Sequence, residues 1–66
     1  MNYEKIYNAL ILKGKNRILE GYKERHHIIP RCMGGNDSKE NLVYLTAREH
    51  FIAHMLLCEI YPTNRK

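Results

Sequence analysis

The four histidines of this chain fall into two closely spaced pairs, and this pattern constrains the fold more than any other feature. His26 and His27 are neighbours in a short stretch that ends at Pro30, whereas His50 and His54 are four residues apart in a stretch with helical periodicity. Side chains at i and i+4 share one helix face, so the second pair can clamp one cation. If the fold packs the first pair against that helix, one metal ion and one general base can share a site.

Each pair alone is weak evidence for such a site. Two histidines at i and i+4 are more often structural or on the surface, and a His-His dipeptide often has one buried, hydrogen-bonded ring and one exposed ring. Zinc peptidases use the same helical spacing but need a glutamate directly after the first histidine. Phe51 follows His50 here, so peptidase chemistry is set aside. The coincidence of the two pairs is what indicates a metal site.

Size and composition limit the number of domains and the kinds of partner. The chain has 66 residues, which allows one domain at most, and a core of this size often needs a metal or a partner. Its net charge of +4 is a weak indication of an anionic partner such as nucleic acid. Cys32 and Cys58 form no Cys-x-x-Cys pair, so we expect two buried thiols in a reducing cytoplasm rather than a zinc knuckle. No apolar run is long enough to span a bilayer.

The N-terminal segment predicts a scaffold helix. Asn2 can cap it, Glu4 complements its dipole, and a glycine at position 14 predicts that it ends between Gly14 and Ile18. A basic cluster lies near its end, and it is either a solvated face or a set of phosphate contacts: Lys13, Lys15 and Arg17. Glu20-Gly21 then predicts a turn.

Two short strands and a second helix follow. Residues 23–29 predict a strand that Pro30 stops, and residues 42–45 predict its antiparallel partner across a long loop at 34–38. A capping box at Thr46–Glu49 predicts a helix that runs to about Ile60. This helix is apolar over most of its circumference, so it needs cover on more than one side, from the hairpin, the first helix, a longer parent chain or a second subunit. The polar residues 63–66 are typical of a linker or a cut.

The His-His dipeptide raises a geometric difficulty. Neighbouring residues on a regular strand point to opposite faces, so His26 and His27 can flank one site only if the strand is strongly twisted or bulged near Pro30. We therefore expect a departure from regular strand geometry there. One of the two would join His50 and His54 as the third metal ligand, and the other would stay free as a base.

These elements together resemble the HNH endonucleases, also called ββα-metal or His-Me finger nucleases. The matching elements are His-His-Ile-Ile-Pro at 26–30, Gly34-Gly35, Asn41-Leu42 and His-x-x-x-His at 50–54. The surrounding residues look similar to the HNH homing endonucleases of tailed phages. The resemblance covers residues 22–61 and implies an α+β fold, a small ββα-metal finger in which a two-stranded antiparallel hairpin packs on a helix. Residues 1–21, the N-terminal helix and turn, precede it in a single nuclease domain, 1–66, which can be part of a longer chain.

The resemblance also implies roles for the matching residues. His26 matches the first metal ligand, and His50 and His54 match the ligands on the helix. His27 matches the general base that activates water. Asn41 completes the catalytic set as the middle asparagine of the motif, whose side chain ties the loop backbone and holds the base in position.

Further contacts are expected around this centre. Glu24 would orient a neighbouring histidine from outside the ligand set. On chemical grounds rather than by motif, we expect phosphate contacts from Arg25, Arg31 and Arg48. The chain lacks the paired cysteines that hold a structural zinc in many members of the family, which argues against a structural zinc but leaves the active site untouched.

The expected function is metal-dependent hydrolysis of DNA phosphodiester bonds, by nicking or double-strand cutting, in a phage homing-type endonuclease acting in the host cytoplasm. One divalent ion is expected. Three imidazoles favour zinc or nickel over magnesium, but magnesium and manganese stay open because the substrate phosphate supplies oxygen ligands.

Several alternatives also stay open. The chain could be a non-catalytic, metal-stabilised DNA-binding finger, or an HNH nuclease of the restriction, packaging or toxin type. A homodimer is an open alternative to a monomer. Target choice would need a further DNA-binding module, which this short chain does not contain by sequence, so the domain alone is expected to have weak specificity.

Overall fold

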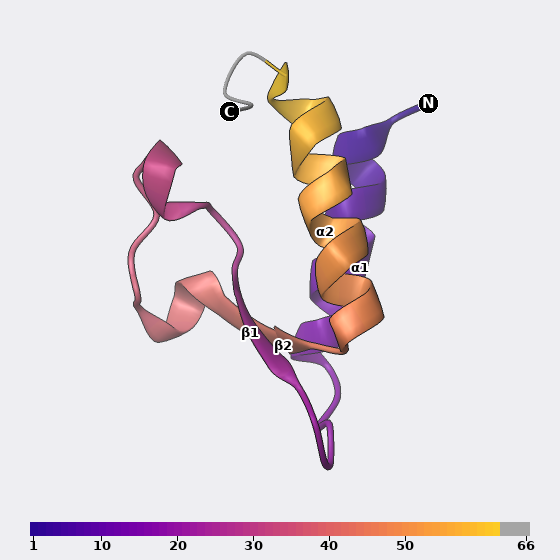
Figure 1. Ribbon diagram of the computed structural model, residues 1–66, viewed down its shortest axis with the longest axis vertical. Coiled ribbons are helices and arrows are strands. Elements are labelled where there is room, and N and C mark those ends of the chain that lie inside the picture. Colours follow the sequence, from indigo (N-terminus) through magenta and orange to yellow (C-terminus); the bar gives the residue numbers. More distant parts are fainter. Residues whose placement is uncertain (63–66) are drawn as a thin grey trace.

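The computed structural model describes residues 1–62, and these form two helices, one hairpin and two short 3-10 helices (Figure 1). Their bounds are Tyr3–Lys15 for α1, Glu24–His27 for β1, Arg31–Met33 for η1, Lys39–Asn41 for η2, Leu42–Leu45 for β2 and Ala47–Ile60 for α2. The predicted α+β order of helix, strand, loop, strand and helix is therefore confirmed. The expectation for residues 63–66 lies outside the described part of the chain.

Local capping signals set the ends of both helices. The Asn2 side chain accepts a hydrogen bond of 3.0 Å from the backbone N–H of Lys5, which satisfies one free donor at the start of α1. At the start of α2, Thr46 and Glu49 form the predicted capping box, with each side chain accepting from the other residue's backbone N–H. The predicted limits of both helices are confirmed.

The hairpin pairs residues one to one. β1 and β2 are antiparallel, with Glu24 opposite Leu45 and His27 opposite Leu42. β1 is shorter than the predicted strand of residues 23–29. Ile28 N–H still donates to the Asn41 carbonyl oxygen in register, but the Asn41 N–H donates to Ser38 and the backbone groups of Ile29 bond to the Asn41 side chain. The expected departure near Pro30 is thus an early end of the strand, and the pairing within Glu24–His27 is regular.

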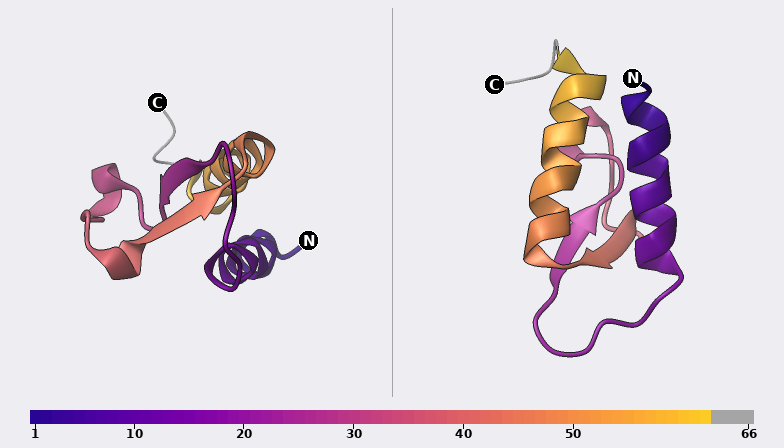
Figure 2. Two further views of the ribbon diagram at one scale, coloured as in Figure 1. Left: turned by 90° about the horizontal axis from the view of Figure 1, so that it is seen from below. Right: turned by 90° about the vertical axis from the view of Figure 1, so that its right-hand side faces the viewer.

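The core lies between the two helices and one face of the hairpin. The helices lie side by side, and the hairpin crosses the C-terminal end of α1 and the N-terminal end of α2 (Figure 2). Gly14 is buried where α1 meets β2, and a Cβ there would lie 2.7 Å from Val43 Cγ2. The helix thus tolerates a poor helix former at a position where only hydrogen fits. The buried apolar side chains are Tyr7, Ile11, Val43, Leu45, Ala53, Leu56 and Leu57.

One side of α2 remains uncovered by the residues that the structure describes. Ala53, Leu56 and Leu57 are buried, whereas Phe51 is 65% exposed and Met55 is 54% exposed. The hairpin and α1 therefore supply part of the cover expected for this apolar helix, and they leave its outer face open.

The basic cluster at the C-terminal end of α1 makes contacts within the fold, which neither the solvated-face nor the phosphate-contact interpretation predicted. Arg17 forms a two-pronged ion pair with Glu49 of α2, in which Nη1 lies 2.9 Å from Oε2. Lys13 Nζ lies 3.5 Å from the same carboxylate. Lys15 Nζ donates to the Glu40 carbonyl oxygen over 3.2 Å. Arg17 thus links the segment after α1 to the start of α2.

Two smaller expectations concern the cysteines and the membrane. Cys32 and Cys58 are both free thiols, but Cys32 is exposed and Cys58 is only half-buried, so the prediction of two buried thiols is wrong. Cys32 lies in η1, on the surface loop, rather than in the core. Within residues 1–62, neither helix combines the length and apolar character needed to cross a bilayer.

Candidate active site

Three histidines converge between β1 and α2. One ring nitrogen from each of His26, His50 and His54 lies within 4.8 Å of the other two. The Nε2 atoms of His50 and His54 are 3.1 Å apart, as expected from their i, i+4 spacing on α2. Nitrogens bound to one zinc ion are roughly 3.3 Å apart, so the spacing of the three rings is close to that of a shared metal site. This convergence was predicted from the sequence.

Glu24 orients His50. The Nδ1 of His50 lies 2.7 Å from Glu24 Oε1, and an ionised carboxylate can only accept, so Nδ1 carries the proton. The other nitrogen, Nε2, is then left with its lone pair toward His54. A hydrogen bond from the Tyr22 hydroxyl, together with the one from His50, lowers the pKa of Glu24 and keeps it ionised. The contact expected of Glu24 is therefore present, and a carboxylate behind a histidine is a common way to orient a metal ligand.

His26 lies on the inner face of the hairpin and is 1% exposed. Burial, with the neighbouring His50, His54 and His27, lowers its pKa to about 4, so the ring is neutral at physiological pH. Its Nε2 lies 2.8 Å from the Tyr7 hydroxyl, whereas its Nδ1 is buried with no hydrogen-bond partner in the described residues. A buried, neutral ring nitrogen with a free lone pair is the state that a metal ligand requires. The donor set thus fits a divalent ion.

His27 is held from the outer side of the same strand. Its Nε2 lies 2.6 Å from Asp37 Oδ1, and a hydrogen bond from His27, reinforced by the charge of Arg31, lowers the pKa of Asp37. The ring of His27, the last residue of β1, nevertheless lines the pocket beside the histidine cluster. That pocket has a volume of about 280 Å³ and is lined by Arg25, His26, His27, Pro30, Arg31, His50 and His54.

Asn41 ties the end of β1 to the loop. Its Oδ1 accepts from Ile29 N–H over 2.8 Å, and its Nδ2 donates to the carbonyl oxygens of Ile29 and Asn36 over 3.1 and 2.8 Å. The side chain is almost fully buried, so these bonds satisfy its amide. Gly35 allows the loop to fold back, since a Cβ there would clash with the Ile29 carbonyl oxygen. Together they fix the segment that carries Asp37.

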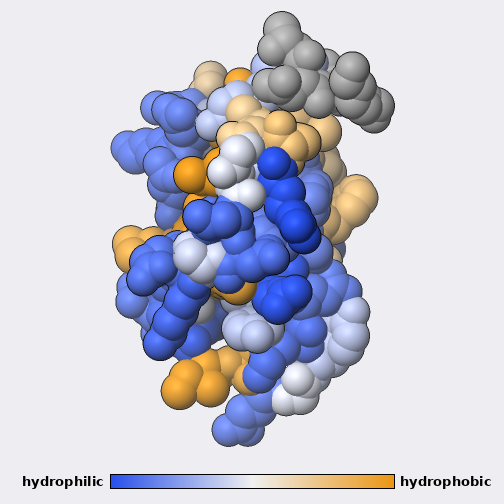
Figure 3. Space-filling model, turned by 90° about the vertical axis from the view of Figure 1, so that its left-hand side faces the viewer, coloured by the Kyte–Doolittle hydropathy of each residue, from blue (hydrophilic) through white to orange (hydrophobic). Residues whose placement is uncertain are grey.

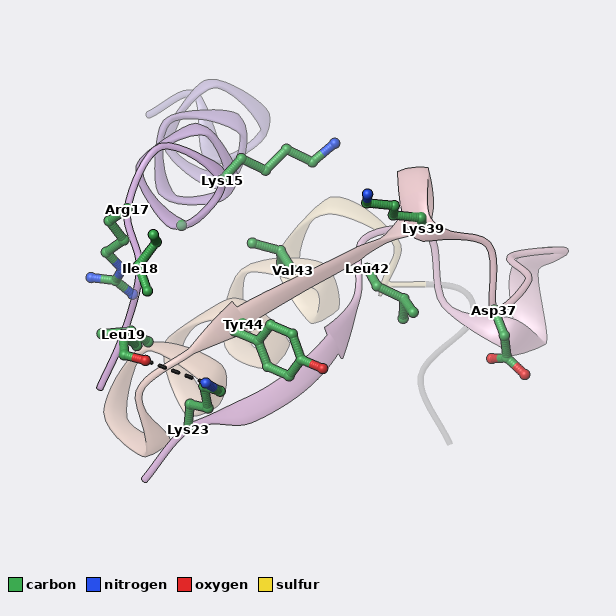
Figure 4. Close-up of a pocket in the computed structure, with 11 residues that line it drawn as sticks. Lys15, Arg17, Ile18, Leu19, Lys23, Asp37, Lys39, Leu42, Val43 and Tyr44 are labelled. Carbon is green, nitrogen blue, oxygen red and sulfur yellow. Dashed lines mark hydrogen bonds between the residues drawn. The ribbon is translucent and has the colours of Figure 1, made fainter. Parts of the chain in front are cut away.

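Two of the three arginines predicted to contact phosphate lie at the histidine pocket, and the third does not. Arg25 and Arg31 are exposed and line the pocket with the histidines, whereas Arg48 is exposed in the first turn of α2 and does not line it. Arg25 lies opposite Tyr44, on the side of the hairpin turned away from the core. A second pocket beside β2 is lined by Lys15, Lys23 and Lys39, and of these Lys23 lies next to Tyr44 (Figure 4). The face that includes the η1 and η2 loop is largely hydrophilic (Figure 3).

Two residues at the site were not singled out from the sequence. Asp37 was identified only as turn chemistry, and its partner His27 is ten residues away. Tyr7 lies in the predicted N-terminal helix and was given no role at the site from the sequence, and its partner His26 is nineteen residues away. No local periodicity connects such pairs. A signal was available for Asp37, because an acid in the loop that closes onto a histidine strand can reach a ring.

The fold and the histidine cluster define a small α+β domain with a candidate three-imidazole metal centre. The chain is similar to probable mobile endonuclease E of Enterobacteria phage T4, with 70% identity over 63 residues, 94% of this chain and 45% of that protein. Probable mobile endonucleases D and B of the same phage are each 62% identical over 66 residues, 92% of this chain. The chain spans less than half of the length of these curated relatives. No family model and no solved structure matches it.

Proposed function

We propose that this chain is a metal-dependent DNA endonuclease domain of the HNH, or ββα-metal, class, which works in a homing-type mobile endonuclease. The observation that carries the proposal is the convergence of His26, His50 and His54 beside a pocket that His27 also lines. The names of the T4 relatives support the nuclease activity, since they match this chain over most of its length. DNA is the proposed substrate.

The proposed metal ligands are the three converging histidines. When bound, a divalent ion would supply positive charge to the nonbridging and leaving oxygens of the scissile phosphate. Three neutral imidazoles favour a transition metal such as zinc or nickel. Magnesium is also compatible if the DNA phosphate and water supply the hard oxygen ligands.

His27 is the proposed general base. Because the Asp37 carboxylate accepts the Nε2–H of His27, the ring presents its unprotonated Nδ1 away from the loop. Nδ1 takes a proton from water as the water oxygen bonds to phosphorus. The bond from phosphorus to the 3′ oxygen breaks, and that oxygen takes a proton from solvent. The products carry a 5′ phosphate and a 3′ hydroxyl. Asp37 acts as a positioning residue that fixes the ring tautomer.

The remaining residues position the substrate and the loop. Arg25 and Arg31 line the pocket and are the proposed phosphate contacts, with Arg48 further along the surface of α2. Asn41 holds the loop that carries Asp37, and Asp37 in turn contacts His27, so Asn41 acts on the proposed base indirectly.

Plasmid cleavage with a metal series tests the proposal. Supercoiled plasmid is incubated with the parent protein or with His27→Ala in magnesium, manganese, nickel or zinc. The parent protein is expected to nick or linearise the plasmid, and the variant is expected to lose about 100- to 10,000-fold in rate while it keeps its fold and metal affinity. A non-catalytic, metal-stabilised finger would instead need His50 for folding and would tolerate the loss of His27. Intact plasmid in every metal would contradict the proposal.

A further inference from the structure

The Tyr7 hydroxyl makes two buried contacts that cannot both use its proton. It lies 2.7 Å from the carbonyl oxygen of Ile28 and 2.8 Å from His26 Nε2. A carbonyl oxygen can only accept, and a hydroxyl has one proton to donate. The proton therefore goes to Ile28, and the contact with His26 must be made by a proton on the ring, with the Tyr7 oxygen as acceptor. Tyr7 is 5% exposed, so water does not compete for these atoms.

This requirement fixes the tautomer of His26. A neutral imidazole carries one N–H, so a proton on Nε2 leaves Nδ1 with a free lone pair. Nδ1 is the ring nitrogen that is buried without a partner in the described residues. The centres of the His50 and His54 rings lie 5.1 and 5.3 Å from the centre of the His26 ring, and one ring nitrogen of each of the three residues lies within 4.8 Å of the other two. With the opposite tautomer, Tyr7 would have to donate twice.

The contact also joins two parts of the chain that the sequence separates. Tyr7 lies on α1, which precedes the ββα core and was interpreted as a scaffold helix, and His26 lies on β1. The two rings meet edge to face, with centres 6.0 Å apart. Ile28 directly follows His27, the candidate base. The Tyr7 hydroxyl therefore links α1 both to the proposed ligand His26 and to the backbone next to His27.

We propose that Tyr7 is a positioning residue that holds His26 in the Nε2–H tautomer and so selects Nδ1 as its metal-binding atom. The inference rests on the proposed metal site, and it assigns α1 a part in that site. Outer hydrogen bonds of this type typically contribute 10- to 100-fold in metal affinity. Glu24 acts on His50 in the same way but from the hairpin, so the two ligands are oriented from different elements, β1 and α1.

The tautomer can be measured in the metal-free protein. Long-range nitrogen–proton correlation spectra of the protein in a chelator, with the His26 ring assigned, report which nitrogen carries the proton. The expected result is a neutral His26 with the proton on Nε2. A ring that carries its proton mainly on Nδ1 would overturn the inference. This readout needs neither metal nor DNA, so it is independent of whether the protein cuts DNA.

A variant tests the consequence for metal binding. Tyr7→Phe keeps the ring in the core and removes the hydroxyl, and Tyr3→Phe, at an exposed position one turn earlier in the same helix, is the matched control. By calorimetric titration with zinc or nickel, Tyr7→Phe is expected to bind about 10- to 100-fold more weakly, and Tyr3→Phe is expected to match the parent. A folded Tyr7→Phe with affinity less than about fivefold below the parent would overturn the inference. If Tyr7→Phe does not fold, the His26 tautomer measured in the metal-free parent protein alone tests the inference.

The two failures are distinguishable. If the tautomer and the affinity loss are as expected but plasmid stays intact, Tyr7 positions a metal ligand in a protein that is not a nuclease. If plasmid is cut and His26 carries its proton on Nδ1, the proposed function stands and the part assigned to Tyr7 is wrong.

Discussion

The two sides of β1 hold adjacent histidines by different means. On the inner side, His26 is buried against Tyr7, His50 and His54, and its orientation depends on how two helices pack. On the outer side, His27 is held by Asp37, whose side chain is 59% exposed on a surface loop. The comparison indicates that the proposed metal centre is anchored in the core through His26, with His54 exposed at its edge. The proposed base lies on β1 and is held by a loop that Asn41 fastens to the end of that strand.

The difference has an energetic consequence. A partly exposed His–Asp pair typically contributes about 0–1 kcal/mol to stability, because solvent screens it. Removing a buried group with defined partners typically costs about 1–3 kcal/mol or more. Changes on the outer side are therefore expected to alter chemistry while the fold persists, and changes on the inner side are expected to alter metal binding and stability together. The variants below test that separation.

The largest effect is expected from removing a helix ligand. His50→Ala keeps a good helix former but leaves two imidazoles, and it also leaves Glu24 without its partner. Metal affinity is expected to fall by more than about 100-fold, beyond the range for an outer hydrogen bond, and cleavage is expected to disappear with it. Titration with zinc and plasmid cleavage measure the two losses. Cleavage that survives without metal binding would break the link between them.

Removing the proposed base is expected to reduce cleavage without weakening metal binding. His27→Ala should reduce cleavage by about 100- to 10,000-fold while zinc affinity stays at the parent value, because the ligand set is intact. Parallel titration and cleavage assays on His27→Ala and His50→Ala test the comparison directly. An equal loss of zinc affinity in both variants would show that the two sides of β1 are not independent.

A smaller effect is expected behind the ligand His50. Glu24→Gln replaces the carboxylate acceptor with an amide, so the Nδ1–H of His50 keeps a weaker partner. Zinc affinity is expected to fall about 10- to 100-fold, less than for His50→Ala. Glu20→Gln, an exposed acid in the turn before β1, is the control and should match the parent. An equal change in both variants would point to net charge rather than to orientation.

The smallest effect concerns the fold away from the site. The ion pair with Arg17 lowers the pKa of Glu49 to about 2, so the folded state favours the ionised carboxylate. The stabilisation is present above the ordinary pKa of 4.5 and is lost as pH falls from there toward about 2. Glu49→Gln keeps an acceptor for the capping box but loses the charge. Urea unfolding in chelator should show the variant less stable by about 1–3 kcal/mol near neutral pH and the gap narrowing in acid. A gap independent of pH would exclude the ion pair as its cause.

The sequence predicted those elements whose signals are local. The Asn2 cap, the Thr46–Glu49 capping box and the apolar residues of β2 each act within a few residues, and both helices and the hairpin follow from them. The i, i+4 spacing likewise predicted that His50 and His54 share a face. These features depend on backbone geometry that any short segment obeys.

The sequence did not predict contacts that depend on three-dimensional packing. Strand β1 ends at His27 rather than at residue 29, because the side chain of Asn41, fourteen residues after His27, bonds to the backbone groups of Ile29 in place of a paired strand. The contact of Tyr7 with His26 and the ion pair of Arg17 with Glu49 depend on the packing of α1, which no local pattern encodes. The roles of the site residues stay predictions until the variants are measured.

The most direct test of the account is a crystal structure of the protein grown with zinc, with the ion located by anomalous scattering. The account predicts one ion about 2.0–2.1 Å from a ring nitrogen of each of His26, His50 and His54, with Nδ1 as the donor of His26 and with His27 unbound. An ion that binds elsewhere, or one that includes His27 among its ligands, would contradict it.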